Sequence, residues 1–245
     1  MLVIFLQFVT NFNLYAQDAQ NAYTQQDDLN QKTREARRLI RESEDVLQEL
    51  IKYSKQGPYI LNHVRAAKAV VIIPNLYKIG FLFGVEAGSG VMMARADNGV
   101  WSYPAFVKIK SGSFGFQVGY QESQLLLLVL TQKGLSSLLN QPVTLGGEIS
   151  AAAGPIGEGY QAATTTQLGA DVLSYMSASG AFIGAALEGS LLTPDDKLTN
   201  IYYVDQDANR KTVILDGLYA NANADRLREM VQDFSDKIID IDDIQ

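Results

Sequence analysis

Glycine is concentrated in the middle of this chain: 18 of its 20 glycines lie between residues 80 and 189. They separate short segments rich in Val, Phe, Tyr and Leu, a pattern typical of strands. Glycine at alternate positions weakens an isolated strand, so its repeated use in residues 113–121 indicates close backbone approach or strong curvature. The middle of the chain is therefore predicted to form a curved β-rich core.

Helical periodicity marks the two ends of the chain. Residues 30–56 carry apolar side chains at spacings of three and four, and residues 224–240 repeat this pattern. The fold class predicted is α+β: a curved, mostly antiparallel Gly-rich β-sheet or open barrel, with the N- and C-terminal helices packed on it.

Shorter elements fill the remaining sequence. Short helices are expected at 58–67 and 133–140, and after Pro194, where Asp195 or Asp196 would accept hydrogen bonds from the first amides. The β-branched run at 69–74 and the apolar run at 125–130 are read as buried strands. Further strands are expected at 113–121, 143–153, 160–167, 170–177, 180–192 and 210–215.

Composition excludes several functional classes. The net charge of −7 argues against a nucleic-acid-binding protein, which usually carries a basic field. The absence of cysteine excludes disulfides, thiolate metal sites and cysteine nucleophiles. With 47% hydrophobic and 19% charged residues, the chain has the composition of a globular domain.

The N-terminus has the features of an export signal. Residues 1–16 carry no charge and include an apolar stretch, and we interpret them as a signal peptide cleaved after Ala16. The polar residues 17–29 are read as a linker, and residues 30–245 as a single domain. We therefore expect an exported protein, periplasmic or extracellular, either free there or peripheral on a membrane.

Basic residues suggest one candidate surface. Arginines at i, i+3, i+4 and i+7 follow the polar face of helix 30–56, and such a face can contact an anionic bilayer. The alternative is that the apolar face packs on the β core and the arginines are solvated. Two lysines flank the first strand, and Lys108 and Lys110 end another; they either join this surface or act as edge charges. The predicted lipid-binding residues are Arg34, Arg37, Arg38, Arg41, Lys68 and Lys78.

Other motifs favour structural roles. The glycines of residues 84–90 lack the Lys-Ser/Thr of a phosphate loop and are read as a turn between strands. Trp101, Tyr103 and Phe106 would line either an acyl-chain pocket or the core. His63 is the only histidine, which leaves histidine-based triads and zinc sites without partners. A carboxylate pair for hydrolysis or calcium binding remains open among Glu86, Glu122, Glu148, Glu158, Asp171 and Glu188.

An ordered set of short motifs resembles the SYLF domain family. The first is the run AKAVVIIP at 67–74, followed by GFLFG at 80–84 and WSYPAF at 101–106. The resemblance covers about residues 58 to 220, and its motifs keep the order and spacing of the family. The remaining matching positions are 88–91, 116–119, 152–157, 174–175, 179–182, 188–190, 194–195 and 202–203.

This resemblance implies a non-catalytic lipid-binding module, without a cofactor, catalytic residues or a metal. Family members in eukaryotes are linked to phosphoinositide membranes and to actin regulation, and bacterial members are commonly exported. Glu86 and Glu158 stand where the family often has basic residues, which argues against a phosphoinositide ligand. The expected partner is an anionic lipid or membrane surface, with an envelope protein as the alternative; export would make actin an unsuitable partner.

Overall fold

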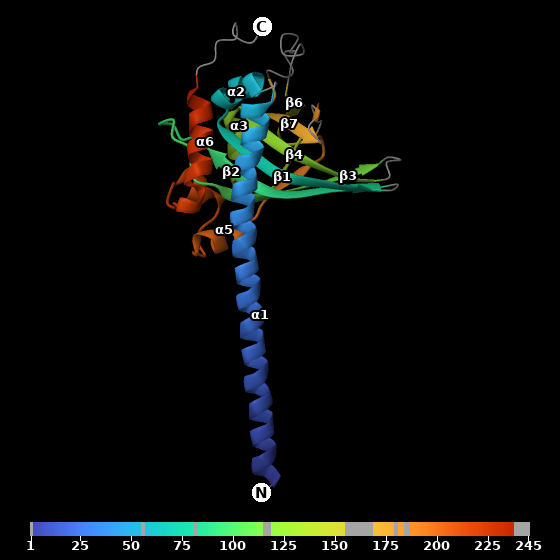
Figure 1. Cartoon of the computed structure of the whole chain (residues 1–245), viewed down its shortest axis with the longest axis vertical. Helices are drawn as coiled ribbons and strands as arrows, with labels where there is room; N and C mark the ends of the chain where they lie inside the picture. The colour runs from blue at the N-terminus through green and yellow to red at the C-terminus, as the bar shows by residue number, and fades with distance from the viewer. Residues whose placement is uncertain are drawn as a thin grey trace.

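A computed structural model describes residues 2–54, 57–80, 83–114, 119–154, 169–178, 181–183 and 187–237. It has the predicted α+β architecture: helices from both ends of the chain pack on one large, mostly antiparallel sheet (Figure 1). The helical elements are α1 (Leu2–Leu47), η1 (Gln48–Tyr53), α2 (Gly57–Ala66), α3 (Gln132–Asn140), α5 (Asp196–Tyr203), η3 (Lys211–Leu215), η4 (Ala222–Ala224) and α6 (Asp225–Asp236).

The sheet has the strand order β5-β9-β3-β2-β1-β4-β7-β6, with β8 paired to β7. Only β6 and β7 pair in parallel among the described ladders. The strands are β1 (Ala69–Gly80), β2 (Phe83–Ala94), β3 (Ala105–Phe114), β4 (Gly119–Val129), β5 (Val143–Thr144), β6 (Ala151–Ala153), β7 (Val172–Ala178), β8 (Ala181–Ile183) and β9 (Leu191–Pro194).

Two hydrophobic clusters lie on opposite faces of this sheet. On one face, α1, η1, α2, α5 and α6 cover side chains such as Val70, Ile72 and Leu126. On the other face, α3 and η3 contribute to a second cluster around Val71 and Leu127. Successive residues of β1 and β4 thus enter different clusters, as the alternation of a strand requires. This explains why both strands read as continuous apolar runs.

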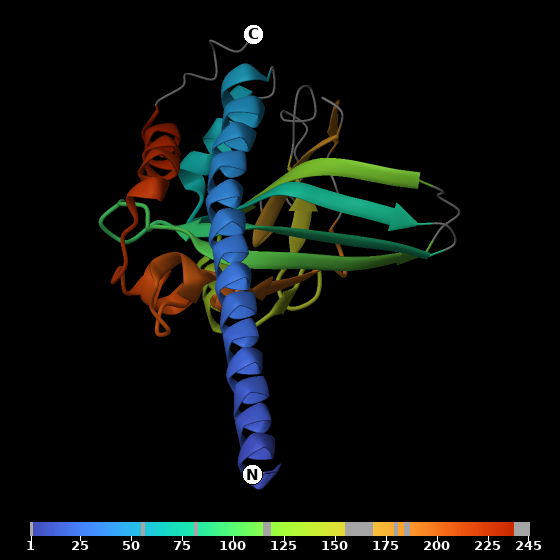
Figure 2. The same ribbon diagram turned by 60° about the horizontal axis from the view of Figure 1, so that its bottom comes forward.

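A β-bulge divides β1 into two parts. The register with β2 shifts between Ile72 and Asn75, and the register with β4 shifts between Ile73 and Leu76. Pro74 lies inside the shift, where its missing N–H breaks no ladder bond that the strand needs. Beyond the bulge, the far parts of β1 to β4 extend past α1 as a four-stranded arm, which Figures 1 and 2 show. We use "the arm" for residues 75–80, 83–89, 110–114 and 119–124.

Several sequence predictions are confirmed. The helices expected at 58–67 and 133–140 are α2 and α3, the helix after Pro194 is α5 with Asp195 as its N-cap, and the C-terminal helix is α6. The buried strand at 125–130 is the inner part of β4. The expected strand 160–167 lies outside the described residues.

Three local predictions are wrong. Residues 210–215 form the helical turn η3 and not a strand, although Thr212, Val213 and Ile214 favour strands. The glycines of 84–90 lie within β2 and not in a turn; a Cβ at Gly90 would come 1.9 Å from the Ile72 carbonyl oxygen at the bulge. Residues 113–121 belong to two strands, β3 and β4, and positions 115–118 lie outside the described residues.

The N-terminal helix begins earlier than expected. The segment 17–29, read as a linker, is helical and continues directly into the predicted helix. It contains neither Gly nor Pro, so no residue in it ends a helix. The signal peptide stays a prediction. In the part of the chain that the structure describes, no helix combines the length and hydropathy needed to cross a bilayer.

Candidate functional site

The apolar face of α1 belongs to the protein core. Ala36, Leu39 and Ile40 are at most 4% exposed and pack in the cluster between the helices and the sheet. These residues produced the amphipathic pattern in the sequence, and Leu47 and Leu50 extend it. In the folded domain this face is already buried, so only the polar face of the helix is accessible to a membrane.

The four predicted arginines lie together on that polar face. Arg34, Arg37, Arg38 and Arg41 are all exposed, and their spacing places them along one side of the helix. Arg38 Nε lies 3.8 Å from Glu42 Oε1. An exposed pair of this kind contributes little in water. We call these four residues the arginine ridge.

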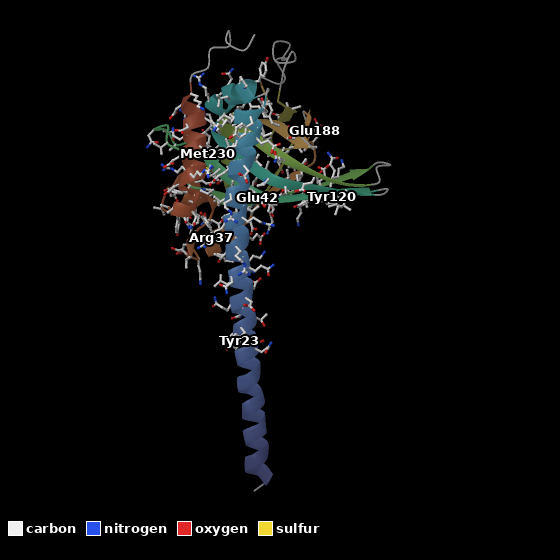
Figure 3. All side chains as sticks on the ribbon, in the orientation of Figure 1. Tyr23, Arg37, Glu42, Tyr120, Glu188 and Met230 are labelled. Atoms are coloured by element: carbon white, nitrogen blue, oxygen red, sulfur yellow. The ribbon has the colours of Figure 1, made fainter. Side chains whose placement is uncertain are left out.

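Acidic residues on the neighbouring face of α1 fix the helix to the sheet. Glu42 accepts a hydrogen bond from Asn75 Nδ2 at 2.9 Å, and Glu49 of η1, which continues α1, accepts one from Gln124 Nε2 at 2.8 Å. Figure 3 labels Arg37 and Glu42, which leave α1 on opposite sides. The acids that dilute the basic charge of the helix therefore hold it in place on β1 and β4.

A groove of about 380 Å³ separates α1 from the sheet. Arg38 and Glu35 stand on its helix side, and Lys108 and Lys110 on its β3 side. The other lining residues are Leu39, Asn75, Tyr77, Ala87, Gly88, Ser89 and Ile109. The sequence left open whether these two lysines join the arginine surface or act as edge charges, and the structure places them across the groove from Arg38.

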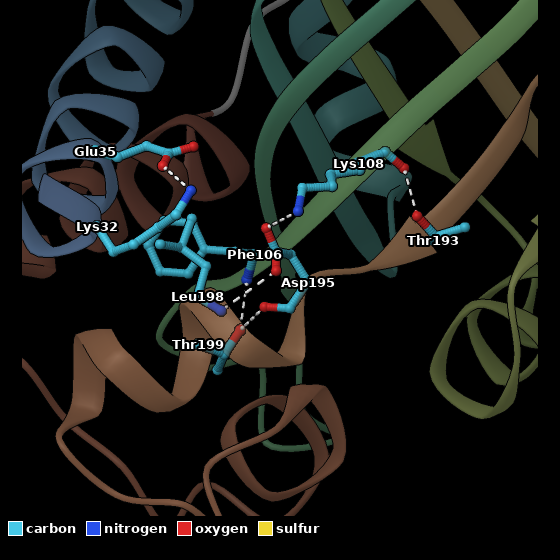
Figure 4. A network of polar contacts seen from close by, with 8 residues as sticks. All are labelled: Lys32, Glu35, Phe106, Lys108, Thr193, Asp195, Leu198 and Thr199. Carbon is cyan, nitrogen blue, oxygen red and sulfur yellow. Dashed lines mark hydrogen bonds and ion pairs between the residues drawn. The ribbon is translucent and has the colours of Figure 1, made fainter. Parts of the chain in front are cut away.

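A capping carboxylate positions one of these lysines (Figure 4). Lys108 Nζ lies 2.6 Å from Asp195 Oδ2, and Asp195 Oδ1 accepts a hydrogen bond from the Leu198 N–H at 3.3 Å. Because Asp195 is the N-cap of α5, the helix and the lysine share one carboxylate. Lys108 and Lys110 are two residues apart in one strand and therefore lie on the same face of it, which the sequence already indicated.

The other two predicted residues lie elsewhere. Lys78 shares a face of β1 with the buried Leu76 and pairs with Glu86 at 2.9 Å, on the side of the sheet away from α1. Lys68 lies directly before β1, at the opposite end of that strand from Lys78. It lines a separate pocket of about 500 Å³ with Arg95 and Asp97. The six predicted residues therefore do not form one patch.

The aromatic cluster and the histidine have structural surroundings. Trp101 and Phe106 are buried in the core, and Trp101 Nε1 donates a hydrogen bond to Ser235 Oγ at 3.0 Å. The core interpretation of these aromatic residues is confirmed. His63 lies half-buried on α2, with Nδ1 2.8 Å from the Tyr175 hydroxyl, and burial lowers the pKa of its imidazole.

Three carboxylates of the β region have separate partners. Glu86 pairs with Lys78, Glu148 accepts a hydrogen bond from the Thr144 N–H, and Asp171 binds Thr131 and Lys133. Within the described ranges, no group of three or more His, Cys, Asp or Glu side chains is arranged to hold a metal. Glu158 lies outside the described residues.

The fold and the site define an α+β domain whose accessible features are a basic helix face, a neighbouring groove and a projecting β arm. The chain belongs to the Ysc84 family, whose model, described as Las17-binding protein actin regulator, matches residues 110–234. This confirms the family resemblance found in the sequence motifs.

Curated relatives give the same assignment. The chain is 29% identical to human "SH3 domain-containing YSC84-like protein 1" over 212 residues, which cover 85% of this chain and 60% of the relative. It is 34% identical to "LAS seventeen-binding protein 3" of Saccharomyces cerevisiae over 145 residues, 58% of this chain and 31% of that protein. The chain thus spans about 60% of the length of the animal relatives.

Proposed function

We propose that this protein is a non-catalytic lipid-binding module that contacts anionic membranes through the arginine ridge of α1. The observation that carries the proposal is the position of four exposed arginines on one helix face of a chain with a net charge of −7. A basic side chain near an anionic surface contributes roughly 1 kcal/mol to the free energy of binding. A local group of arginines can therefore bind such a surface although the net charge of the chain is negative.

The proposed contact is electrostatic and peripheral. Because the apolar face of α1 is packed on the sheet, the helix cannot insert that face into a bilayer without unfolding the core. Lys110, across the groove from Arg38, adds to the basic surface, whereas the charge of Lys108 is paired with Asp195. Lys68 and Lys78 lie on other parts of the molecule and are not included in this contact.

Family relationships support a binding role. The family description names a Las17-binding actin regulator, and the yeast relative is named for binding LAS seventeen. For this chain we propose export to the periplasm or the extracellular space, where a lipid or an envelope protein would be the partner. Intact-mass measurement of the protein recovered from its native host would test export: a chain beginning at Gln17 supports it, and one retaining residues 1–16 contradicts it.

Vesicle co-sedimentation tests the lipid contact. The full chain is mixed with vesicles of phosphatidylcholine alone, or with added phosphatidylserine, at low and high salt. We expect binding only to the anionic vesicles, weakened by salt. Replacing Arg34, Arg37, Arg38 and Arg41 by Gln is expected to weaken binding by more than about tenfold, from roughly 1 kcal/mol per residue.

A matched variant controls for net charge. Lys52, Lys197, Lys211 and Lys237 are exposed and lie outside α1, so their replacement by Gln changes the charge equally. This variant is expected to bind within about twofold of wild type, since screening limits the effect of distant charges. Equal binding by both variants would reject the arginine ridge as the contact, and no binding by wild type to any vesicle would reject a lipid ligand.

A further inference from the structure

Four large apolar side chains are exposed on the arm. Ile79, Val85 and Tyr120 are 61–63% exposed, and Tyr77 is 39% exposed. Figure 3 shows Tyr120 on the part of the sheet that extends beyond α1. Scattered exposed apolar residues are ordinary on a protein surface, but a contiguous group is a mark of an interaction site.

Strand register shows that the four side chains form one patch. Ile79 lies directly opposite Val85 on β2 and opposite Tyr120 on β4, so the three form a row across the sheet. Tyr77 is two residues from Ile79 and therefore shares its face. Its ring stacks on that of Tyr120, with centroids 5.9 Å apart. We call these four residues the arm patch.

The patch faces the same side of the sheet as α1. Tyr77 lines the groove together with Arg38, whereas the neighbouring Leu76 points into the cluster on the other face. The arm patch is thus continuous, through the groove, with the arginine ridge. The two surfaces can reach one flat partner together.

Polarity changes along the arm. One row near the tip of the arm holds Val85, Ile79 and Tyr120, and the next row inward runs from Lys110 through Ala87 and Tyr77 to Glu122. Lys108 follows one row further in. Rows are two residues apart, roughly 7 Å along a strand. Apolar groups therefore lie at the far end, with two lysines about one and two rows behind them.

We propose that the arm inserts its patch into the interfacial region of an anionic bilayer. An interfacial element buries its apolar side chains about 5–10 Å below the headgroups, which matches the depth of one or two rows. Tyrosine rings favour the headgroup level, and Lys110 and Arg38 then lie near lipid phosphates, while Lys108 stays paired with Asp195. The single acid of the patch rows, Glu122, is on the β4 side, away from these cations.

This inference rests on the membrane binding proposed above and adds the apolar contact that α1 cannot supply. It makes a separate prediction, because insertion can be measured apart from binding. Trp101 is the only tryptophan and is buried, with its indole N–H bonded to Ser235, so wild type provides a constant background. A tryptophan placed in the patch reports its own surroundings.

The experiment uses the full chain carrying Tyr120→Trp, with Leu218→Trp as the control. Leu218 is 69% exposed and lies outside the arm. On anionic vesicles containing brominated lipid, we expect the tryptophan at position 120 to be quenched and blue-shifted, and the one at position 218 to behave as in water. An unquenched tryptophan at position 120 in vesicle-bound protein would overturn the inference.

A matched pair of double variants tests the contribution of the patch to affinity. Ile79→Gln with Val85→Gln is compared with Leu215→Gln with Leu218→Gln, which removes apolar side chains of similar exposure elsewhere. We expect the first pair to weaken vesicle binding by about tenfold or more and the second to leave it unchanged. Circular dichroism confirms that each variant is folded; if the first pair is not folded, the quenching result decides.

The outcomes separate the two proposals. The arginine variant could lose binding while position 120 is not quenched and Ile79→Gln with Val85→Gln has no effect. This result would support the arginine ridge as the contact and reject insertion of the arm. Quenching at position 120 with full binding by the arginine variant would support the arm and reject the ridge as the contact. A protein that binds none of the vesicles would overturn both.

Discussion

At the scale of single residues, Asp171 is a carboxylate surrounded by several hydrogen-bond donors. It accepts hydrogen bonds from Thr131 Oγ1 at 2.5 Å, from Lys133 Nζ at 3.1 Å, and from the N–H and hydroxyl of Ser150 at 2.9 and 3.0 Å. Burial opposes the charged form, but these donors outweigh it and lower the pKa of the carboxyl to about 2. One side chain thereby joins the start of α3 to the segments before β6 and β7.

This pKa sets a pH dependence of stability. The pKa of Asp171 in the folded state is below its unfolded value of about 4. The ionised carboxylate therefore stabilises the folded state above pH 4, and this stabilisation is lost as the pH falls towards 2. Its size is roughly 2 kcal/mol. We expect Asp171→Asn to lower the free energy of unfolding at neutral pH and to flatten its decline between pH 4 and 2, as measured by urea unfolding.

An exposed carboxylate provides the control for Asp171. Asp97→Asn, in the loop after β2, is expected to retain both the stability and the acid sensitivity of wild type. The same steep decline in Asp171→Asn as in wild type would show that other groups cause it.

At the scale of elements, Asp195 shows how one residue can start a helix and place a side chain of the site. It caps α5 and binds Lys108. Asp195→Asn keeps an N-cap oxygen and removes the charge, whereas Asp195→Ala removes both. We expect Asn to retain most of the stability and Ala to lose about 1 kcal/mol in thermal or urea unfolding. Equal losses would show that the ion pair, and not the cap, stabilises this element.

Local signals explain which elements were predictable. The Pro194-Asp195 start of α5 and the apolar spacing of α6 act over a few residues, so the sequence shows them directly. The wrong strand at 210–215 has a local cause as well. Asn209 Oδ1 accepts hydrogen bonds from the N–H groups of Lys211 and Thr212, and this capping favours a helical turn over the strand preference of the β-branched residues.

The candidate surface was predictable only in part. Helical spacing alone places four arginines on one face of α1. Strand register decides which lysines lie near these arginines. The bulge at Pro74 matters most, because the residues that follow it in β1 point to the opposite face of the sheet from the one that simple alternation predicts. The arm patch depends on register in the same way, because its members come from β1, β2 and β4.

At the scale of the whole molecule, one sheet separates two cores, and α1 extends beyond both. Figures 1 and 2 show the N-terminal half of α1 leaving the body of the protein. Residues 20–31 are exposed throughout, and the first buried residue described on the helix is Ala36. The packing that stabilises the domain therefore begins at Ala36, within the arginine ridge.

Removing residues 1–16 should consequently leave the domain intact. A chain beginning at Gln17 is expected to unfold at the same urea concentration as the full chain, because the deleted residues precede an exposed stretch of helix that makes no contribution to either core. Leu50→Ala, at a fully buried position of η1, should in contrast cost about 2–5 kcal/mol. A clear fall in the midpoint of the shortened chain would mean that the extended helix packs on the domain, and the arginine ridge would then no longer be an open face of the molecule.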